Sequence, residues 1–264
     1  MEECSAFLPF SRVVKSKLCS KCPLVLRILL SYTAPMHISK TPPPAFNIPS
    51  KVLLLVALFI LCFLLFDSLD SHQYITAISR FALIPANVLH APWSLVSYSF
   101  LHDGWEHLIF NSAWLVIFGS TIARHLGNVR FFLFFIFCIL SAGGVYVIFH
   151  IGSNFPAIGA SGATFGMFGA LMRFLFPPQG GILSAQPQSL EKTLQNRQTL
   201  TIIAVIIGID LLFATVSGIL GNGVIAWEAH IGGFIAGLIC FGWFAPPTRS
   251  ISGGPGNFNY GEWR

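Results

Sequence analysis

Charged side chains are scarce in this sequence, and the scarcity excludes an ordinary soluble protein. Asp, Glu, Lys and Arg make up 9% of the 264 residues, whereas a typical soluble domain has about 25%. Hydrophobic residues make up 54% of the chain, including 26 Phe, and the mean hydropathy is +0.72. A soluble core of this length does not need so much apolar surface, but lipid-facing helices do. The composition therefore predicts a polytopic membrane protein.

The alternation of apolar and polar residues that a membrane β-barrel requires is also missing. The apolar residues form continuous runs instead, and only helices or closed barrels can span a bilayer. We therefore expect an all-α fold with six transmembrane helices, most of them close to the ~20 residues that cross ~30 Å of hydrocarbon. The six apolar segments cover residues 51–66, 107–123, 131–150, 161–176, 200–220 and 227–244.

The sequence also contains few patterns of metal-binding residues. Cys19 and Cys22 have the spacing of half a zinc site, but no second pair follows them. The sequence has no H-E-x-x-H motif and no cluster of acidic ligands. His102 and His107 are five residues apart, a spacing that does not align on one helix face. We therefore expect no metal and no other cofactor.

Positive charge is almost confined to one side of the predicted membrane. Of the 15 Lys and Arg residues, 14 lie on one predicted side of the membrane, and Arg80 is the exception. These 14 lie before or at the start of the first segment, after the sixth, or in and beside the connections between segments two and three and between segments four and five. The positive-inside rule then predicts that both termini are cytoplasmic. Anionic lipid at the inner leaflet accounts for the net charge of +5, so no nucleic-acid partner is expected.

The same pattern divides the chain into three regions. We expect a poorly ordered cytoplasmic segment at 1–46, a six-helix membrane domain at 47–248 and a cytoplasmic tail at 249–264. Residues 1–35 are expected to be dispensable, because their apolar patch at 23–30 is too short to span a bilayer and no clean signal-peptide cleavage site follows it.

Polar side chains occur at the starts of three of the six segments. With the N-terminus inside, segments two, four and six all run from outside to inside, so their first turns share the outer leaflet. These turns carry His107 and Asn111, then Ser161, and then His230. The order of crossings thus predicts that all four side chains lie at one depth, where polar groups are costly and usually functional.

These residue types suit acyl transfer. A serine hydroxyl is a weak nucleophile until a base takes its proton, and an imidazole can do so near neutral pH. We therefore predict that Ser161 is a nucleophile and His230 its base. His107 and Asn111 share a helix face and could donate hydrogen bonds to the developing oxyanion. Taken singly, each of the four also has a structural interpretation in packing, capping or interhelical hydrogen bonding.

No carboxylate is assigned to a catalytic triad. Glu228 is only two residues from His230, so the two should point to different helix faces. Asp103 and Glu106 belong to the external loop. Asp210 lies midway along the fifth segment, and without a second acidic partner in the segments it is expected to be a hydrogen-bonded or protonated structural carboxyl. The expectation is a Ser–His dyad.

Three separated motifs, in this order, resemble those of the rhomboid intramembrane serine proteases in their six-helix bacterial form. The resemblance covers about residues 50–245 and rests on His102 with His107 and Asn111, on Gly159-Ala-Ser161-Gly162, and on Ala229-His230-Ile-Gly-Gly233-Phe-Ile-Ala-Gly237. It implies the same catalytic roles for Ser161 and His230, and oxyanion stabilisation by His107 and Asn111. The motif glycines, which let helix backbones approach closely, are expected to shape the active site: Gly159, Gly162, Gly233 and Gly237.

The resemblance also implies roles around this centre. His102 is expected to be structural, near the external loop. Trp93 matches the tryptophan of a family Trp-Arg pair, whereas Ser94 replaces the arginine. Residues 200–220 and 221–225 would form a gate and a cap over the site.

The resulting expectation is an integral-membrane endopeptidase of the bacterial inner membrane, built as a rhomboid-like helical bundle. It would cleave transmembrane segments of other proteins within the lipid bilayer, from a site towards the extracytoplasmic side. The alternative is a catalytically inactive rhomboid-like protein that binds client helices, although such relatives typically lack the serine or the histidine. A transporter is disfavoured, because no inverted repeat or paired intramembrane charges are evident. No oligomeric state is predicted.

Overall fold

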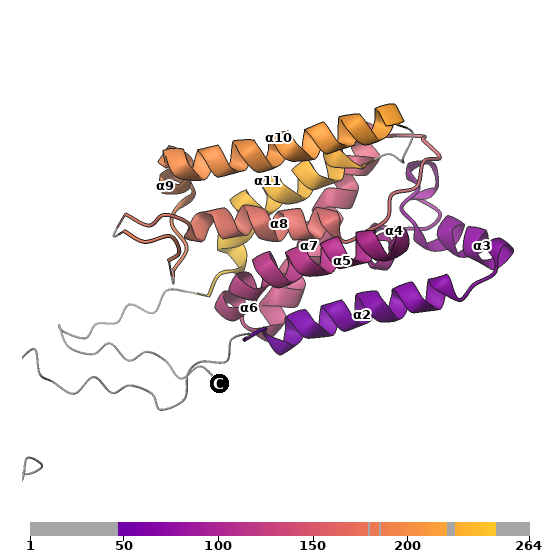
Figure 1. Cartoon of the computed structure of the whole chain (residues 1–264), viewed down its shortest axis with the longest axis horizontal. Helices are drawn as coiled ribbons and strands as arrows, with labels where there is room; N and C mark the ends of the chain where they lie inside the picture. The colour runs from indigo at the N-terminus through magenta and orange to yellow at the C-terminus, as the bar shows by residue number, and fades with distance from the viewer. Residues whose placement is uncertain (1–46, 179, 185, 221–224, 247–264) are drawn as a thin grey trace, which may run out of the picture. The chain divides into compact units, whose positions relative to one another are not determined.

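Helices form most of the part of the chain that the computed structural model describes, which is residues 47–178, 180–184, 186–220 and 225–246 (Figure 1). Ile48–Arg264 separates from Met1–Asn47 as a unit of its own, and the description concerns that unit. The predictions for residues 1–35, for the Cys19 and Cys22 pair and for the tail at 249–264 fall outside the described residues.

The long helices lie where the apolar segments predicted them. In chain order the helices are α2 (Ser50–Asp67), α3 (Ser71–Phe81), α4 (Ser94–Ser97), α5 (Gly104–Trp114), α6 (Ser120–Leu126), α7 (Asn128–Phe149), α8 (Ser161–Leu171), α9 (Leu190–Gln195), α10 (Arg197–Leu220) and α11 (Trp227–Phe244). A π-helical turn, Leu115–Gly119, joins α5 to α6. Within the described ranges, extended pairing is limited to two isolated bridges, Leu83 with Ala157 and Leu175 with Leu183. The prediction of an all-α membrane protein is confirmed.

Four helices are long and apolar enough to cross a bilayer: α2, α7, α10 and α11. The other two predicted crossings have a different form. The second consists of α5, the π turn and α6 in succession, and the fourth is an α8 of only 11 residues followed by a 3-10 turn. At 1.5 Å per residue, α8 alone extends about 16 Å, roughly half the hydrocarbon thickness. The number of full crossings therefore remains a prediction.

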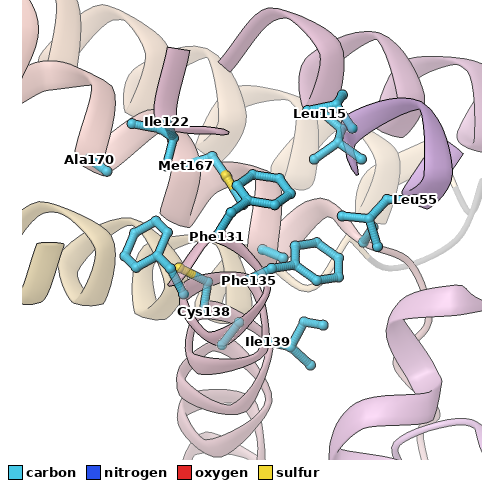
Figure 2. Packing of buried hydrophobic residues seen from close by; sticks show 14 of the residues in the cluster. Leu55, Leu115, Ile122, Phe131, Phe135, Cys138, Ile139, Met167 and Ala170 are labelled. Atoms are coloured by element: carbon cyan, nitrogen blue, oxygen red, sulfur yellow. The ribbon is translucent and has the colours of Figure 1, made fainter. Parts of the chain in front are cut away.

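Helix α8 lies in the middle of the bundle, packed on α7 and most extensively on α11. Its apolar face contributes to the main core, in which aromatic and aliphatic side chains from α2, the π turn, α6 and α7 meet it (Figure 2). The labelled members of that core are Leu55, Leu115, Ile122, Phe131, Phe135, Cys138, Ile139, Met167 and Ala170. Because α8 has neighbours on several sides, its first turn is held between other helices.

Glycines allow α8 and α11 to pack backbone against backbone. A Cβ added at Gly233 would fall on the carbonyl oxygen of Gly162, and one added at Gly237 would fall on that of Gly166. No side chain fits at either position, so the two backbones approach as closely as small-residue interfaces in membranes permit. This packing brings the first turns of α8 and α11 side by side.

Helix α10 lies at the edge of the bundle beside α11 (Figure 1). In the described structure Thr199 is its only fully buried residue. Its contacts with α8 and α11 are largely apolar and centre on Phe168 and Phe234, against which Ile202 and Ile206 pack. Most of the α10 surface is therefore available to lipid.

The polar ends of the bundle differ in charge. Lys51 Nζ donates to Asn128 Oδ1 at 3.0 Å, joining the starts of α2 and α7, and Arg173 Nε donates to the carbonyl of Gln188 at 3.0 Å near the end of α8. The other end carries α3 and α4, well away from α6 and α9 (Figure 1). The backbone N–H of Gly159 donates to the carbonyl of Tyr98 at this second end, at 2.9 Å. The start of α8 thus lies at the end opposite Lys51 and Arg173, the end that also carries Arg80 in α3.

Candidate active site

Ser161 and His230 meet at the starts of two neighbouring helices. Ser161 is the first residue of α8, and His230 lies in the first turn of α11. The Ser161 Oγ and His230 Nε2 are 2.8 Å apart, a hydrogen-bonding distance across which a proton can pass. His230 is buried and Ser161 is partly buried, so the hydroxyl is sheltered but not sealed.

Phe165 fixes the plane of the imidazole. Its ring stacks on that of His230, with the centroids 4.4 Å apart and the planes 6° from parallel. The sequence interpretation did not identify this residue. The sequence feature that could have identified Phe165 is its position four residues after Ser161, which puts both side chains on one face of α8. The stacking limits rotation of His230 and so keeps Nε2 directed at Ser161.

Asp210 contacts the other ring nitrogen of His230, Nδ1. Its Oδ1 is 2.8 Å from His230 Nδ1, and the side chains of His230 and Asp210 are only 8% and 10% exposed. The sequence pattern assigns no carboxylate to Ser161 and His230, whereas the structure places Asp210 against His230. The hydrogen-bonding role predicted for Asp210 is consistent with this contact, and the Ser–His dyad as the catalytic unit stays a prediction. Nothing in the spacing of segments five and six indicates that these two residues face each other, because the rotation of each helix is set by tertiary packing.

Glu228 contacts a different histidine, in line with the prediction that Glu228 and His230 point to different helix faces. Its Oε1 is 3.1 Å from Nε2 of His150 at the end of α7, and the ring of Tyr146 packs on that histidine with centroids 4.5 Å apart. The pair joins the end of α7 to the start of α11. Two largely buried carboxylates, Asp210 and Glu228, therefore each contact one imidazole.

His107 approaches the turn that precedes Ser161. Its Nδ1 accepts a hydrogen bond from the backbone N–H of Asp103 at 3.3 Å, which leaves Nε2 to carry the ring proton in the neutral form. A Cβ at Gly159 would lie 2.5 Å from that Nε2, and Gly159 has a φ of +106°. Both the positive φ and the close approach require glycine at this position.

Asn111 lies one helical turn after His107 and is buried. Its Nδ2 donates to the carbonyl of His107 at 2.9 Å. That bond uses one of the two N–H groups of the amide, and in the described structure no hydrogen bond joins the Asn111 side chain to Ser161. The predicted placement of Asn111 and His107 on one face of α5 is therefore seen, while a role in catalysis stays a prediction.

His102 and Trp93 each contact neighbouring residues near the start of α5 and the loop before it. His102 packs against Phe59 and His107, with ring centroids 5.2 Å away in each case, and burial lowers its pKa to about 3. A neutral ring in an aromatic environment agrees with the structural role expected of it. Trp93 Nε1 donates to the carbonyl of Arg80 at 2.9 Å, while Ser94 is buried beside it.

The proposed gate and cap are only partly described. Helix α10 contains the predicted gate, residues 200–220, but of the predicted cap only Ile225 belongs to the described residues. In the described part of the chain no three His, Cys, Asp or Glu side chains gather at a point where a metal ion would sit.

Comparison with known proteins identifies the class to which this helical membrane fold belongs. A protein-family model of the rhomboid domain matches residues 89–246, which is more than half of the 264 residues and includes all of α5–α11. The chain therefore belongs to the rhomboid family.

Curated relatives agree with this assignment. The chain is 29% identical over 150 residues to RHOMBOID-like protein 4 of Arabidopsis thaliana, covering 56% of this chain and 32% of that protein. It is 32% identical over 146 residues to rhomboid protease GluP of Bacillus subtilis, covering 55% of this chain and 25% of the relative. It is 28% identical over 148 residues to rhomboid protease GlpG of Haemophilus influenzae, covering 56% of this chain and 67% of the relative. The first two matches thus span a third or less of the relatives' own lengths.

Proposed function

We propose that this protein is an intramembrane serine endopeptidase in which Ser161 is the nucleophile and His230 the general base. The observation that carries the proposal is the 2.8 Å contact between Ser161 Oγ and His230 Nε2, made by two helices of a rhomboid domain. Names of relatives add support, since two of them are rhomboid proteases.

The chemistry follows from this contact. Ser161 Oγ attacks a peptide carbonyl carbon while its proton moves to His230 Nε2. The tetrahedral intermediate then expels the amine, which takes that proton as the C–N bond breaks, and leaves an ester on Ser161. A water molecule, deprotonated by His230, hydrolyses the ester and restores the free serine. The stacked ring of Phe165 keeps the imidazole in position through both halves of the reaction.

Oxyanion stabilisation would come from groups around the start of α8. The first backbone N–H groups of a helix have no intrahelical acceptor, so that of Ser161 is available, and the helix dipole adds partial positive charge there. The Nε2–H of His107 lies beside Gly159, two residues before the nucleophile. Asn111 retains a second amide N–H that could also contribute. Donors of this kind are typically worth about 100- to 1,000-fold each in kcat.

Substrates are proposed to be transmembrane segments of other proteins. The site lies at the end of the bundle opposite most of the basic residues, Arg80 being the exception. The positive-inside rule assigns that basic end to the cytoplasm, so the site would face the extracytoplasmic side of a bacterial inner membrane. A helical substrate keeps its carbonyls in hydrogen bonds and must unwind before attack. Segments with Gly, Pro or Ala near the cut should therefore be preferred.

Reconstitution into lipid vesicles with a fluorescently labelled single-span substrate tests the proposal. We expect two products, whose masses place the cut within the membrane segment, and a fluorophosphonate adduct on the peptide that contains Ser161. The matched control is the same preparation blocked by fluorophosphonate before the substrate is added. Binding of the substrate without any cleavage or adduct would identify a non-catalytic rhomboid protein instead.

His107→Ala should lower kcat by about 100- to 1,000-fold with little change in KM, because the lost donor contacts only the charged transition state. Steady-state cleavage in vesicles measures both constants. His72→Ala removes an exposed histidine from α3 and serves as the control with unchanged rates. An unaltered kcat for His107→Ala would remove His107 from the oxyanion site.

A further inference from the structure

Helix α10 supplies a largely buried carboxylate to the histidine of the proposed catalytic pair. Asp210 and His230 come from helices that otherwise meet mainly through apolar side chains, yet Asp210 Oδ1 lies 2.8 Å from His230 Nδ1. At about one-tenth exposure, a polar contact of this kind is screened little by water. Intramembrane carboxyl groups are costly and usually functional, so the position of Asp210 requires an explanation.

The contact determines which ring nitrogen carries the proton. With Asp210 ionised, its carboxylate only accepts hydrogen bonds, so His230 Nδ1 donates to Asp210. In the neutral ring the other nitrogen, Nε2, is then unprotonated and can accept from the hydroxyl of Ser161. The opposite tautomer would direct an N–H at Ser161 and could not take its proton. The three groups therefore form a continuous hydrogen-bonded chain from α10 through α11 to α8.

We infer that Asp210 is a positioning residue for this protein's peptidase reaction, acting through His230. This role rests on the proposed function and adds Asp210 to the predicted dyad, giving a serine–histidine–aspartate arrangement. Asp210 holds the reactive tautomer and the ring orientation, and its negative charge stabilises the imidazolium that forms when Ser161 gives up its proton. Because Asp210 is carried by the loosely packed α10, the competence of His230 depends on α10 being seated against α11.

A matched pair of acid-to-amide substitutions isolates this role. Asp210→Asn replaces the carboxyl beside His230 at nearly constant shape, whereas Glu228→Gln replaces the second largely buried carboxyl, which contacts His150 instead. We expect Asp210→Asn to lower kcat by about 100-fold or more with KM nearly unchanged. The rate of fluorophosphonate labelling should fall in parallel, and Glu228→Gln should leave both rates within about twofold of the parent protein.

A spectroscopic measurement on the unmodified protein avoids dependence on the folding of any variant. The 15N chemical shifts of histidine distinguish a ring protonated at Nδ1 from one protonated at Nε2, and a His230→Gln difference spectrum assigns the signal. We expect Nδ1–H in the parent protein and a shift towards Nε2–H or a mixture in Asp210→Asn. A purely structural hydrogen bond between helices would change thermal stability without this pattern of kcat loss at constant KM.

The outcomes separate the two claims. An active parent protein in which Asp210→Asn retains full kcat, or a parent in which His230 carries its proton on Nε2, would overturn the positioning role and leave the peptidase intact. Equal losses in Asp210→Asn and Glu228→Gln would also overturn it, because the effect would then not be specific to His230. A parent protein that neither cleaves substrate nor reacts with fluorophosphonate would refute the proposed function itself.

Discussion

Replacing Ser161 with alanine is expected to abolish both substrate cleavage and fluorophosphonate labelling, with kcat falling by about 10,000-fold or more. The change removes the only hydroxyl that contacts His230 Nε2 in the described structure, and no other group there can form the acyl intermediate. Cleavage in vesicles, followed to low rates by mass spectrometry, measures the loss. Thermal unfolding should change little, because Ser161 is partly exposed to the site and alanine favours the helix.

Combining this change with His230→Ala provides the sharper test. When two residues act together in one catalytic step, removing either one abolishes the contribution of both to kcat. The double variant should therefore be no slower than Ser161→Ala alone. Two independent contributions would instead multiply. A multiplicative loss, or residual cleavage in Ser161→Ala at the parent's rate, would contradict the assignment of these two groups.

Gly237→Ala should destabilise the bundle and inactivate it through the backbone. The added Cβ would fall on the carbonyl oxygen of Gly166 and lie 2.6 Å from its carbonyl carbon. Backbone atoms cannot rotate aside, so α8 and α11 must separate, at a cost of about 1–3 kcal/mol or more. We expect a midpoint of thermal unfolding lower by about 2–12 °C and an activity loss larger than the loss of folded protein, because Ser161 and His230 belong to these two helices.

Gly144→Ala is the matched control for this steric prediction. Gly144 lies within α7, and a Cβ there would meet nothing within 4 Å. Alanine should therefore be neutral or should stabilise the helix by up to about 1 kcal/mol. Parallel thermal unfolding of the two variants, followed by tryptophan fluorescence, compares them directly. Equal stability of Gly237→Ala and Gly144→Ala would show that the two backbones are not in tight contact.

The helices themselves could be located from hydropathy, because a membrane span requires a continuous apolar run. This reasoning located α2, α7, α10 and α11 within a few residues. It was weaker for α8, where the apolar run continues past Leu171 but the helix tightens into a 3-10 turn. Local geometry at a helix end depends on which residues pack against it, and a run of apolar residues does not indicate those packing partners.

The proximity of Ser161 and His230 could be anticipated from the order of crossings and from small residues on both helices. The same reasoning missed Phe165 and gave Asp210 no partner. Stacking and hydrogen bonding between helices depend on the rotation of each helix about its axis. For an almost uniformly apolar helix such as α10, the sequence offers little amphipathic signal that would fix this rotation.

The sequence by itself determined that the chain is a helical membrane protein, because a backbone that crosses lipid must satisfy its own hydrogen bonds. It also determined which few polar side chains lie at the starts of the apolar segments, because such residues are rare there. Only the tertiary structure decided which of those groups touch. The close backbone packing of α8 on α11 sets the 2.8 Å contact between Ser161 and His230. The seating of α10 beside them brings Asp210 to the far side of the same ring, because distances between helices arise from packing and not from spacing along the chain.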